Sequence, residues 1–225
     1  MIKRFIHFTV TGFIYIVLSI LCKVDKSEIS RLPEKGPCLF VTNHVNFLEV
    51  PLIYTCVQPR IVHSLIKMET WKNPFLRFLA GIWHAIPIKR GTADFSAFSA
   101  AEQVFKNEGI LIMAPEGTRS KTGILQRGHA GAVLLAVHNN VPIYPLVHTG
   151  GEKLYTNLKK FRRTAFKFHV GKPFYINTNG EKLDSAFRQK LTTQLMSRIA
   201  VLLPEEQRGH YALENLDFTP NLRDA

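Results

Sequence analysis

Two residues that could activate a hydroxyl group, His44 and Glu49, stand five positions apart directly after the apolar run of residues 38–41. A free imidazole has a pKa of about 6.5, so near neutral pH it is mostly able to accept a proton. A histidine within hydrogen-bonding distance of a hydroxyl can take its proton during attack on a thioester, which accelerates such reactions by roughly 10²–10⁴-fold. The pair therefore indicates general-base catalysis.

Glu49 is the local candidate to orient His44, because it is the only acidic residue between His44 and Glu69. Its carboxylate would bind the second ring nitrogen, fix the tautomer and stabilise the imidazolium. Five residues along a regular helix would place the two side chains about 140° apart. We therefore expect the chain to turn between them, with Glu49 near the start of a helix. The alternative is a surface histidine beside a glutamate that caps a helix.

A second polar cluster, residues 116–120, also follows an apolar run. Gly117 would let the backbone approach a ligand closely, Thr118 adds a hydroxyl donor, and Arg119 offers a planar fork suited to phosphate. Glu116 could hold Arg119 in place or bind a glycerol hydroxyl. Taken together, the two clusters predict acyl transfer to the hydroxyl of a phosphorylated acceptor. The alternative for residues 116–119 alone is an ordinary polar turn.

Arg90 is a further candidate to bind an anion, because it follows a short predicted strand. The alternative for Arg90 is an arginine at a strand end that faces solvent.

Strands and helices alternate along the chain, which predicts an α/β fold with a mixed, largely parallel sheet flanked by helices. Both polar clusters would follow strands, where ligands gather in such folds. The proline at position 87 suggests an edge strand or an irregular pairing. The predicted strands are residues 39–42, 60–66, 85–88, 110–113, 143–147 and 166–170, and the predicted helices are 49–56, 70–79, 94–106, 128–138 and 183–203.

Residues 5–22 carry no formal charge and would form a helix roughly 27 Å long, against a hydrocarbon core of about 30 Å. No small-residue cleavage site ends the segment, which disfavours a cleaved signal peptide. It could span the membrane, lie in one leaflet, or be a buried core helix. We expect residues 1–30 to be a membrane-associated helical segment and residues 31–225 to form the α/β domain at the cytoplasmic face.

The composition is that of a globular protein of 225 residues, with a formal net charge of +12. Such a charge favours an anionic partner, either an acidic lipid surface or nucleic acid. Basic residues are concentrated in residues 151–175, whose alternative interpretation is a solvated basic loop. The three cysteines form no CxxC pair, which disfavours a disulfide framework or a zinc site.

Four blocks of the sequence resemble, in order and spacing, those of the glycerolipid acyltransferases typified by 1-acylglycerol-3-phosphate acyltransferase. That family carries Asn-His-x4-Asp, a block ending in Arg, Phe-Pro-Glu-Gly-Thr-Arg-Ser and Val-Pro-Ile-x-Pro. The corresponding blocks here are Asn43-His44-x4-Glu49, Ile86-Pro87-Ile88-Lys89-Arg90, Ala114-Pro115-Glu116-Gly117-Thr118-Arg119-Ser120 and Val141-Pro142-Ile143-Tyr144-Pro145.

The resemblance implies that His44 is the catalytic base and Glu49 its orienting partner. The residues that it implies for substrate binding are Arg90, Glu116, Gly117, Thr118 and Arg119. It further implies an acyl-CoA or acyl-carrier-protein donor, no cofactor or metal, and a lysophospholipid acceptor, foremost 1-acylglycerol-3-phosphate to give phosphatidic acid.

Two positions depart from the family pattern: Glu49 replaces Asp, and Ala114 replaces Phe. The longer Glu49 side chain could displace the histidine, and such misplacement can cost about 10²-fold in rate. The smaller Ala114 side chain could make room for a larger acceptor.

Three alternatives remain open. The acceptor could be another lysolipid or an amino-acid lipid, or the chain could be a non-catalytic lipid-binding protein at a membrane surface. A nucleic-acid-binding protein is disfavoured because the basic residues form no recognised motif. A serine hydrolase is disfavoured because no Gly-x-Ser-x-Gly segment is present.

Overall fold

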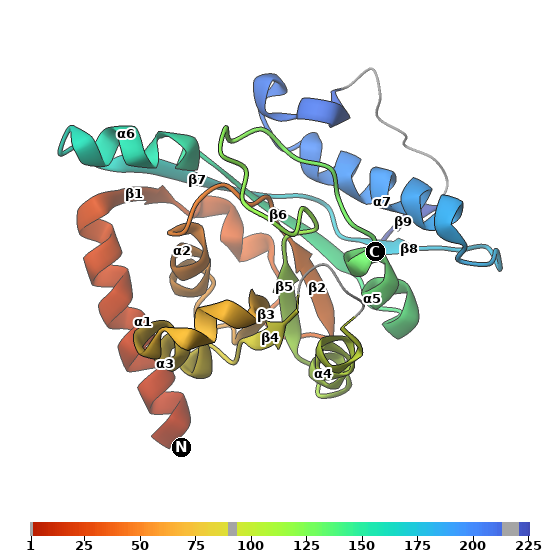
Figure 1. The fold of residues 1–225 in the computed structure, drawn as a ribbon, viewed down its shortest axis with the longest axis horizontal. Helices are drawn as coiled ribbons and strands as arrows, with labels where there is room; N and C mark the ends of the chain where they lie inside the picture. Colours follow the sequence, from red (N-terminus) through yellow and green to blue (C-terminus); the bar gives the residue numbers. More distant parts are fainter. Residues whose placement is uncertain (1, 90–93, 213–220) are drawn as a thin grey trace.

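The computed structural model describes residues 2–89, 94–212 and 221–225, and a sheet with helices on both faces forms its centre (Figure 1). Nine strands of the described chain join the sheet. They are β1 Cys22–Asp25, β2 Cys38–Val41, β3 Val62–Lys67, β4 Ile86–Ile88, β5 Ile110–Met113, β6 Ile143–Thr149, β7 Thr164–Val170, β8 Phe174–Ile176 and β9 Leu222–Asp224.

The main strand order is β1-β7-β6-β2-β5-β3-β4, with β8 and β9 attached beside β6. Strands β6, β2, β5, β3 and β4 run parallel, while β7 pairs antiparallel with β6 and parallel with β1. This mixed, largely parallel sheet confirms the predicted fold class. Strand β4 with its proline lies at the edge, as expected, because proline has no N–H to donate to a second neighbour.

Seven α-helices of the described chain surround the sheet: α1 Ile2–Leu21, α2 Glu49–Cys56, α3 Pro74–Ile82, α4 Phe95–Lys106, α5 Gly131–Asn139, α6 Leu154–Lys159 and α7 Ser185–Ala200. Successive side chains of β2 point to opposite faces of the sheet. Leu39 and Val41 pack with α4, α5 and α7, whereas Cys38 and Phe40 pack with α2 and the buried Leu18 of α1. Each face of the central strands therefore has its own apolar core.

Most predicted elements are confirmed within a few residues, and α2 and β5 match their predicted bounds. The helix predicted at residues 70–79 is present but displaced: residues 68–72 form a 3-10 helix, and α3 begins at Pro74. Asn73 has extended backbone angles, and its side chain accepts the N–H of Leu76. An extended residue before proline, followed by proline in the first turn, is a normal helix start.

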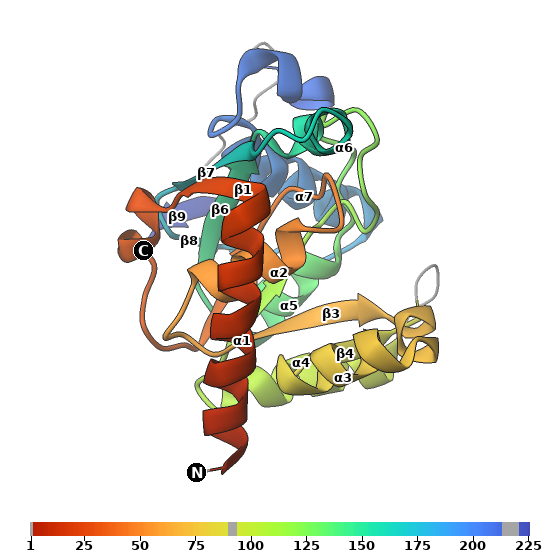
Figure 2. The same cartoon turned by 90° about the vertical axis from the view of Figure 1, so that its left-hand side faces the viewer.

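Helix α1 lies against the α/β domain, and its N-terminal end extends past the rest of the protein (Figure 2). His7 Nδ1 is 2.9 Å from the carbonyl oxygen of Ile82, and Trp83 Nε1 donates to Thr11 Oγ1 at 3.1 Å. Near its other end, Arg163 donates to the carbonyl oxygens of Ser19 and Cys22 at 2.6 and 2.7 Å. The helix is therefore docked at three levels rather than extending away from the domain.

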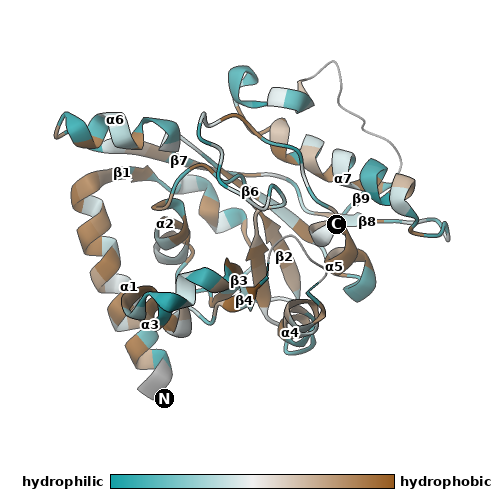
Figure 3. Ribbon diagram, viewed as in Figure 1, coloured by the Kyte–Doolittle hydropathy of each residue, from teal (hydrophilic) through white to brown (hydrophobic). Residues whose placement is uncertain are grey.

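The outward face of α1 is apolar. Residues 4–21 are long and apolar enough to cross a membrane, and only 17% of them are buried. The exposed side chains include Phe5, Phe13, Ile16 and Ile20, and Figure 3 shows hydrophobic residues along most of the helix. A burial so low contradicts the interpretation of this segment as a core helix. The expected division of the chain at residue 30 stays a prediction.

Candidate active site

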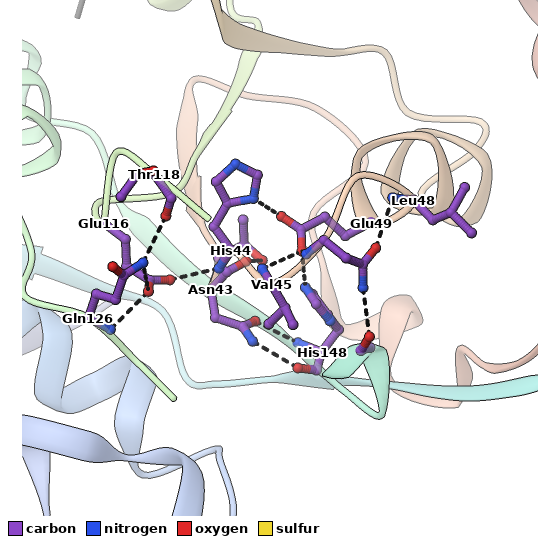
Figure 4. Close-up of polar contacts among 12 residues, drawn as sticks. Asn43, His44, Val45, Leu48, Glu49, Glu116, Thr118, Gln126 and His148 are labelled. Carbon is purple, nitrogen blue, oxygen red and sulfur yellow. Dashed lines mark hydrogen bonds and ion pairs between the residues drawn. The ribbon is translucent and has the colours of Figure 1, made fainter. Parts of the chain in front are cut away.

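Three neighbouring parallel strands bring the site together. Strands β6, β2 and β5 lie side by side, so their carboxyl ends meet at one edge of the sheet. His44 follows β2, Glu116 follows β5, and His148 lies near the end of β6. Figure 4 shows these side chains and Glu49 gathered in one cluster.

The predicted pair is in contact: Nδ1 of His44 meets Oε1 of Glu49. Glu49 is the first residue of α2, so the chain turns between the two residues as expected. The Glu49 side chain is only 2% exposed, whereas that of His44 is 14% exposed. Because Nδ1 is occupied by Glu49, the second ring nitrogen of His44 remains available to a substrate.

The other carboxylate oxygen of Glu49 is surrounded by nitrogen atoms. The backbone N–H groups of Val45 and Asn46 donate to Oε2 at 2.7 and 3.0 Å. His148 Nε2 lies 3.0 Å from the same oxygen. Burial acts to raise the pKa of Glu49, but the His148 and His44 contacts outweigh it and hold that pKa at about 2. Glu49 is therefore ionised at neutral pH.

Sequence reasoning missed His148. Its side chain is fully buried, and its ring contacts Phe166 and Phe168. The Asn43 side chain accepts the backbone N–H of His148 and donates to its carbonyl oxygen, both at 2.9 Å. The sequence feature that could have indicated His148 is its position shortly after the block 141–145, in a strand that could neighbour β2.

Glu116 joins the two polar clusters through backbone contacts. Its Oε1 accepts the N–H of His44 at 2.7 Å, and its Oε2 accepts the N–H of Gln126 at 2.9 Å. The N–H of Ser120 donates to the carbonyl oxygen of His44 at 2.7 Å. Burial raises the pKa of Glu116 to about 7, although these hydrogen bonds act in the opposite direction.

The remaining predicted substrate-binding residues lie around this junction. Gly117 has a φ of +67° and lines the pocket beside His44, while Thr118 and Arg119 are exposed. Within the described chain no ion pair joins Glu116 to Arg119, so the suggestion that Glu116 holds Arg119 in place is wrong: the Glu116 carboxylate is buried and bonded to His44 and Gln126 instead. Arg90 lies outside the described residues.

An apolar pocket of about 150 Å³ opens beside the His44–Glu49 pair. It runs between α2 and β3, and its wall also includes β4 and β5. The lining residues are Thr42, His44, Glu49, Val50, Ile53, Tyr54, Ser64, Leu65, Ile66, Ile88, Ile112, Met113, Ala114 and Gly117. A larger open cavity of about 630 Å³, beside β1 and β7, contains neither His44 nor Glu49. In the described chain, no three metal-type ligands gather in a way that could hold a metal ion.

The fold and the site define a mixed α/β protein in which a buried carboxylate orients a histidine at the mouth of an apolar pocket. The Acyltransferase family matches residues 23–149, more than half of the chain. The chain belongs to this family, as the resemblance of its four blocks implied.

Relatives support the same assignment. Human 1-acyl-sn-glycerol-3-phosphate acyltransferase beta is 29% identical over 133 residues, which are 58% of this chain and 48% of the human protein. Lyso-ornithine lipid O-acyltransferase of Pseudomonas aeruginosa is 27% identical over 121 residues, 53% of this chain and 45% of that protein. The chain thus spans about half the length of these relatives.

The structure resembles that of the 1-acyl-sn-glycerophosphate acyltransferase PlsC from Thermotoga maritima. The TM-score is 0.65 at 20% sequence identity, and the alignment covers 86% of this chain and 77% of that one. This likeness confirms the fold.

Proposed function

We propose that the protein is a membrane-associated O-acyltransferase that moves a fatty acyl group from a thioester to the free hydroxyl of a lysophospholipid, favouring 1-acylglycerol-3-phosphate as acceptor. The observation that carries this proposal is the contact of His44 with the buried, ionised Glu49 at the mouth of an apolar pocket. Family membership and the names of the relatives support the same reaction.

In the proposed step, His44 Nε2 takes the proton of the acceptor hydroxyl while the hydroxyl oxygen attacks the thioester carbonyl carbon. Collapse of the tetrahedral intermediate breaks the C–S bond, and the leaving thiolate takes the proton from the imidazolium. The products are the ester and the free thiol of CoA or acyl carrier protein. Glu49 fixes the tautomer and stabilises the imidazolium, as the acid of a catalytic triad does.

His148 and Glu116 act in this proposal as positioning residues. His148 meets the Glu49 oxygen that does not contact His44, and thereby restrains the carboxylate from the far side. Glu116 accepts the backbone N–H of His44, so it fixes the position of the loop that carries His44 relative to residues 116–120. Both act through another residue, because both side chains are buried.

The apolar pocket is the proposed site for the acyl chain. Its wall is mostly aliphatic, and burying a methylene group is worth about 0.8 kcal/mol. At its inner wall the Tyr54 hydroxyl lies 2.9 Å from Ser64 Oγ and 3.1 Å from the carbonyl oxygen of Trp83. These contacts fix the Tyr54 ring, which also stacks on Trp83.

Helix α1 is the proposed membrane anchor, lying in one leaflet rather than crossing it. To cross the bilayer alone it would have to give up its contacts with Ile82, Trp83 and Arg163. Lying flat, it keeps them and presents its apolar outward face to lipid. This placement keeps the active site on the side of the membrane where cytoplasmic thioesters are found.

The acceptor has a second candidate, a lysolipid with an amino-acid headgroup, because one relative is named a lyso-ornithine lipid O-acyltransferase. Arg119 is the proposed ligand for the acceptor phosphate. An amino-acid headgroup would not offer Arg119 this phosphate to bind.

Acyl transfer to lysophosphatidic acid and to lyso-ornithine lipid, measured for the wild type and for Arg119→Ala, tests this proposal. We expect Arg119→Ala to raise the KM for lysophosphatidic acid at least tenfold and to leave the KM for acyl-CoA within about twofold, since a charge-assisted hydrogen bond contributes roughly 1.5–3 kcal/mol. Turnover of lyso-ornithine lipid alone would select the second candidate. Equal effects on both KM values would contradict a phosphate role for Arg119.

A further inference from the structure

The turn between α6 and β7, residues 159–163, carries an exposed phenylalanine among four basic residues; we call it the basic tip. Phe161 is 101% exposed, and its φ is +51°. Few bulky residues adopt this left-handed region, because Cβ then crowds the backbone. The position thus combines backbone strain with exposure of a large apolar side chain.

The backbone of the basic tip is held by regular hydrogen bonds. The N–H of Phe161 donates to the carbonyl oxygen of Leu158 at 3.1 Å, and the N–H of Arg162 donates to that of Asn157 at 2.9 Å. A glycine or asparagine would satisfy the same turn with less strain. The fold therefore gives no reason for a phenylalanine here, and strain of this kind is often found at functional sites.

The charges of the basic tip are also unbalanced. Lys159, Lys160 and Arg162 are exposed, and among residues 2–89, 94–212 and 221–225 none of the three has an acidic partner within ion-pair distance. Arg163 instead fixes the tip to the end of α1 through the carbonyl oxygens of Ser19 and Cys22. The basic tip is thereby held at the end of the helix that carries the exposed apolar side chains.

Both views place the basic tip and α1 on one side of the molecule. Helix α1 and the outer end of α6 lie at the left of Figure 1, and the same side faces the viewer in Figure 2 together with α3. Helix α3 carries two exposed phenylalanines of its own, Phe75 and Phe78. A nucleic acid would meet the cations but leave the apolar faces of α1 and α3 uncovered, whereas a lipid bilayer matches both.

We propose that the basic tip is a second membrane contact, in which Phe161 enters the interface of an anionic leaflet and Lys159, Lys160 and Arg162 bind lipid phosphates. A basic residue near such a surface contributes a factor of about five in binding. The tip would thus fix the rotation of the protein about α1 and make binding depend on anionic lipid. This proposal rests on the proposed membrane placement of α1 and does not depend on the proposed reaction.

Vesicle co-sedimentation in a His44→Ala background tests the proposal without altering the lipids. The vesicles are phosphatidylcholine alone or phosphatidylcholine with phosphatidylglycerol. Replacing Lys159, Lys160 and Arg162 by Gln should weaken binding to the anionic vesicles about a hundredfold and leave binding to neutral vesicles within about twofold. The control replaces Lys106, Lys182 and Lys190, three exposed lysines away from α1 and α6, and should have little effect. Wild-type binding by the tip variant, or an equal loss in the control, would overturn the proposal.

Phe161→Asn tests the insertion separately from the charges. Because asparagine tolerates the left-handed region, Tm should stay equal or rise, while binding to both kinds of vesicle should fall several-fold. The matched control is Phe95→Ala on α4, where the side chain is 82% exposed, and it should not change binding. Unchanged binding by Phe161→Asn would show that Phe161 does not enter the membrane, and a lower Tm would contradict the backbone strain inferred at this position.

Discussion

At the scale of residues, the catalytic proposal depends on how Glu49 is held. One of its oxygens meets His44, and the other meets two backbone N–H groups and His148. An aspartate is one methylene shorter and could not reach all of these partners from the same backbone. The surroundings of Glu49 thus fit the longer glutamate side chain, although the family motif has aspartate at this position.

We expect Glu49→Asp to lower kcat by about 10²-fold with little change in KM, because the histidine loses its orientation. His148→Leu should lower kcat about tenfold in the wild type but have much less effect when Glu49 is already Asp, since the two act together. His148→Gln retains an N–H donor and should restore part of the rate. Equal losses in both backgrounds, accompanied by a lower Tm, would show that His148 only supports the fold.

The buried Glu116 predicts a distinctive dependence of stability on pH. Its pKa rises from an ordinary 4.5 to about 7, so between these values the folded protein binds more protons than the unfolded chain. The free energy of unfolding should therefore fall as pH rises from 4.5 to 7, by about 3 kcal/mol from this group, and then level off.

Thermal unfolding of the wild type, Glu116→Gln and the surface control Glu205→Gln from pH 5 to pH 8 checks this. Only Glu116→Gln should gain stability relative to the wild type as the pH increases. Parallel curves for the wild type and Glu116→Gln would exclude an elevated pKa.

At the scale of elements, the sequence was informative where local signals are strong. The Asp94 cap of α4 and the apolar run of β5 were predicted and observed. The contact between His44 and Glu49 was also predicted, because only a turn can bring residues at that spacing together. Strands β1, β8 and β9 were not predicted, since they are three or four residues long and depend on distant partners. His148 was missed for the same reason: its contact with Glu49 depends on strand order.

The pocket between α2 and β3 gives a prediction at this scale. Leu65 lines it from β3, and Leu65→Ala should widen it and shift the donor preference towards longer or bulkier acyl chains, as a several-fold change in relative kcat/KM. The expected loss of stability is about 2–3 kcal/mol. Leu202→Ala is the control, because Leu202 packs against the same apolar core outside the pocket. The measurement is kcat/KM across acyl-CoA chain lengths for the wild type, Leu65→Ala and Leu202→Ala. The same chain-length preference in all three proteins would exclude this pocket as the acyl site.

At the scale of the whole molecule, the active site and the apolar side of the protein are linked through α2. This helix begins with Glu49 and packs against the sheet on the same face as Leu18 of α1. Helix α1 in turn carries the outward apolar residues and contacts the basic tip. In the proposed arrangement, a lipid substrate meets the catalytic pair on a protein that α1 and the basic tip hold at the membrane surface. This long-range arrangement could not be read from the sequence, which indicated only an apolar segment and a basic one.

The central claim is that His44, oriented by Glu49, is the base for acyl transfer. The most direct measurement is turnover of acyl-CoA and lysophosphatidic acid in detergent by the wild type, His44→Ala and His138→Ala. His138 is a matched control, because its Nε2 lies 2.6 Å from Glu102 Oε1 in a surface His–Glu pair outside the pocket. We predict that His44→Ala lowers kcat at least 10³-fold with an unchanged Tm, whereas His138→Ala retains wild-type turnover. Wild-type turnover by folded His44→Ala would contradict the account.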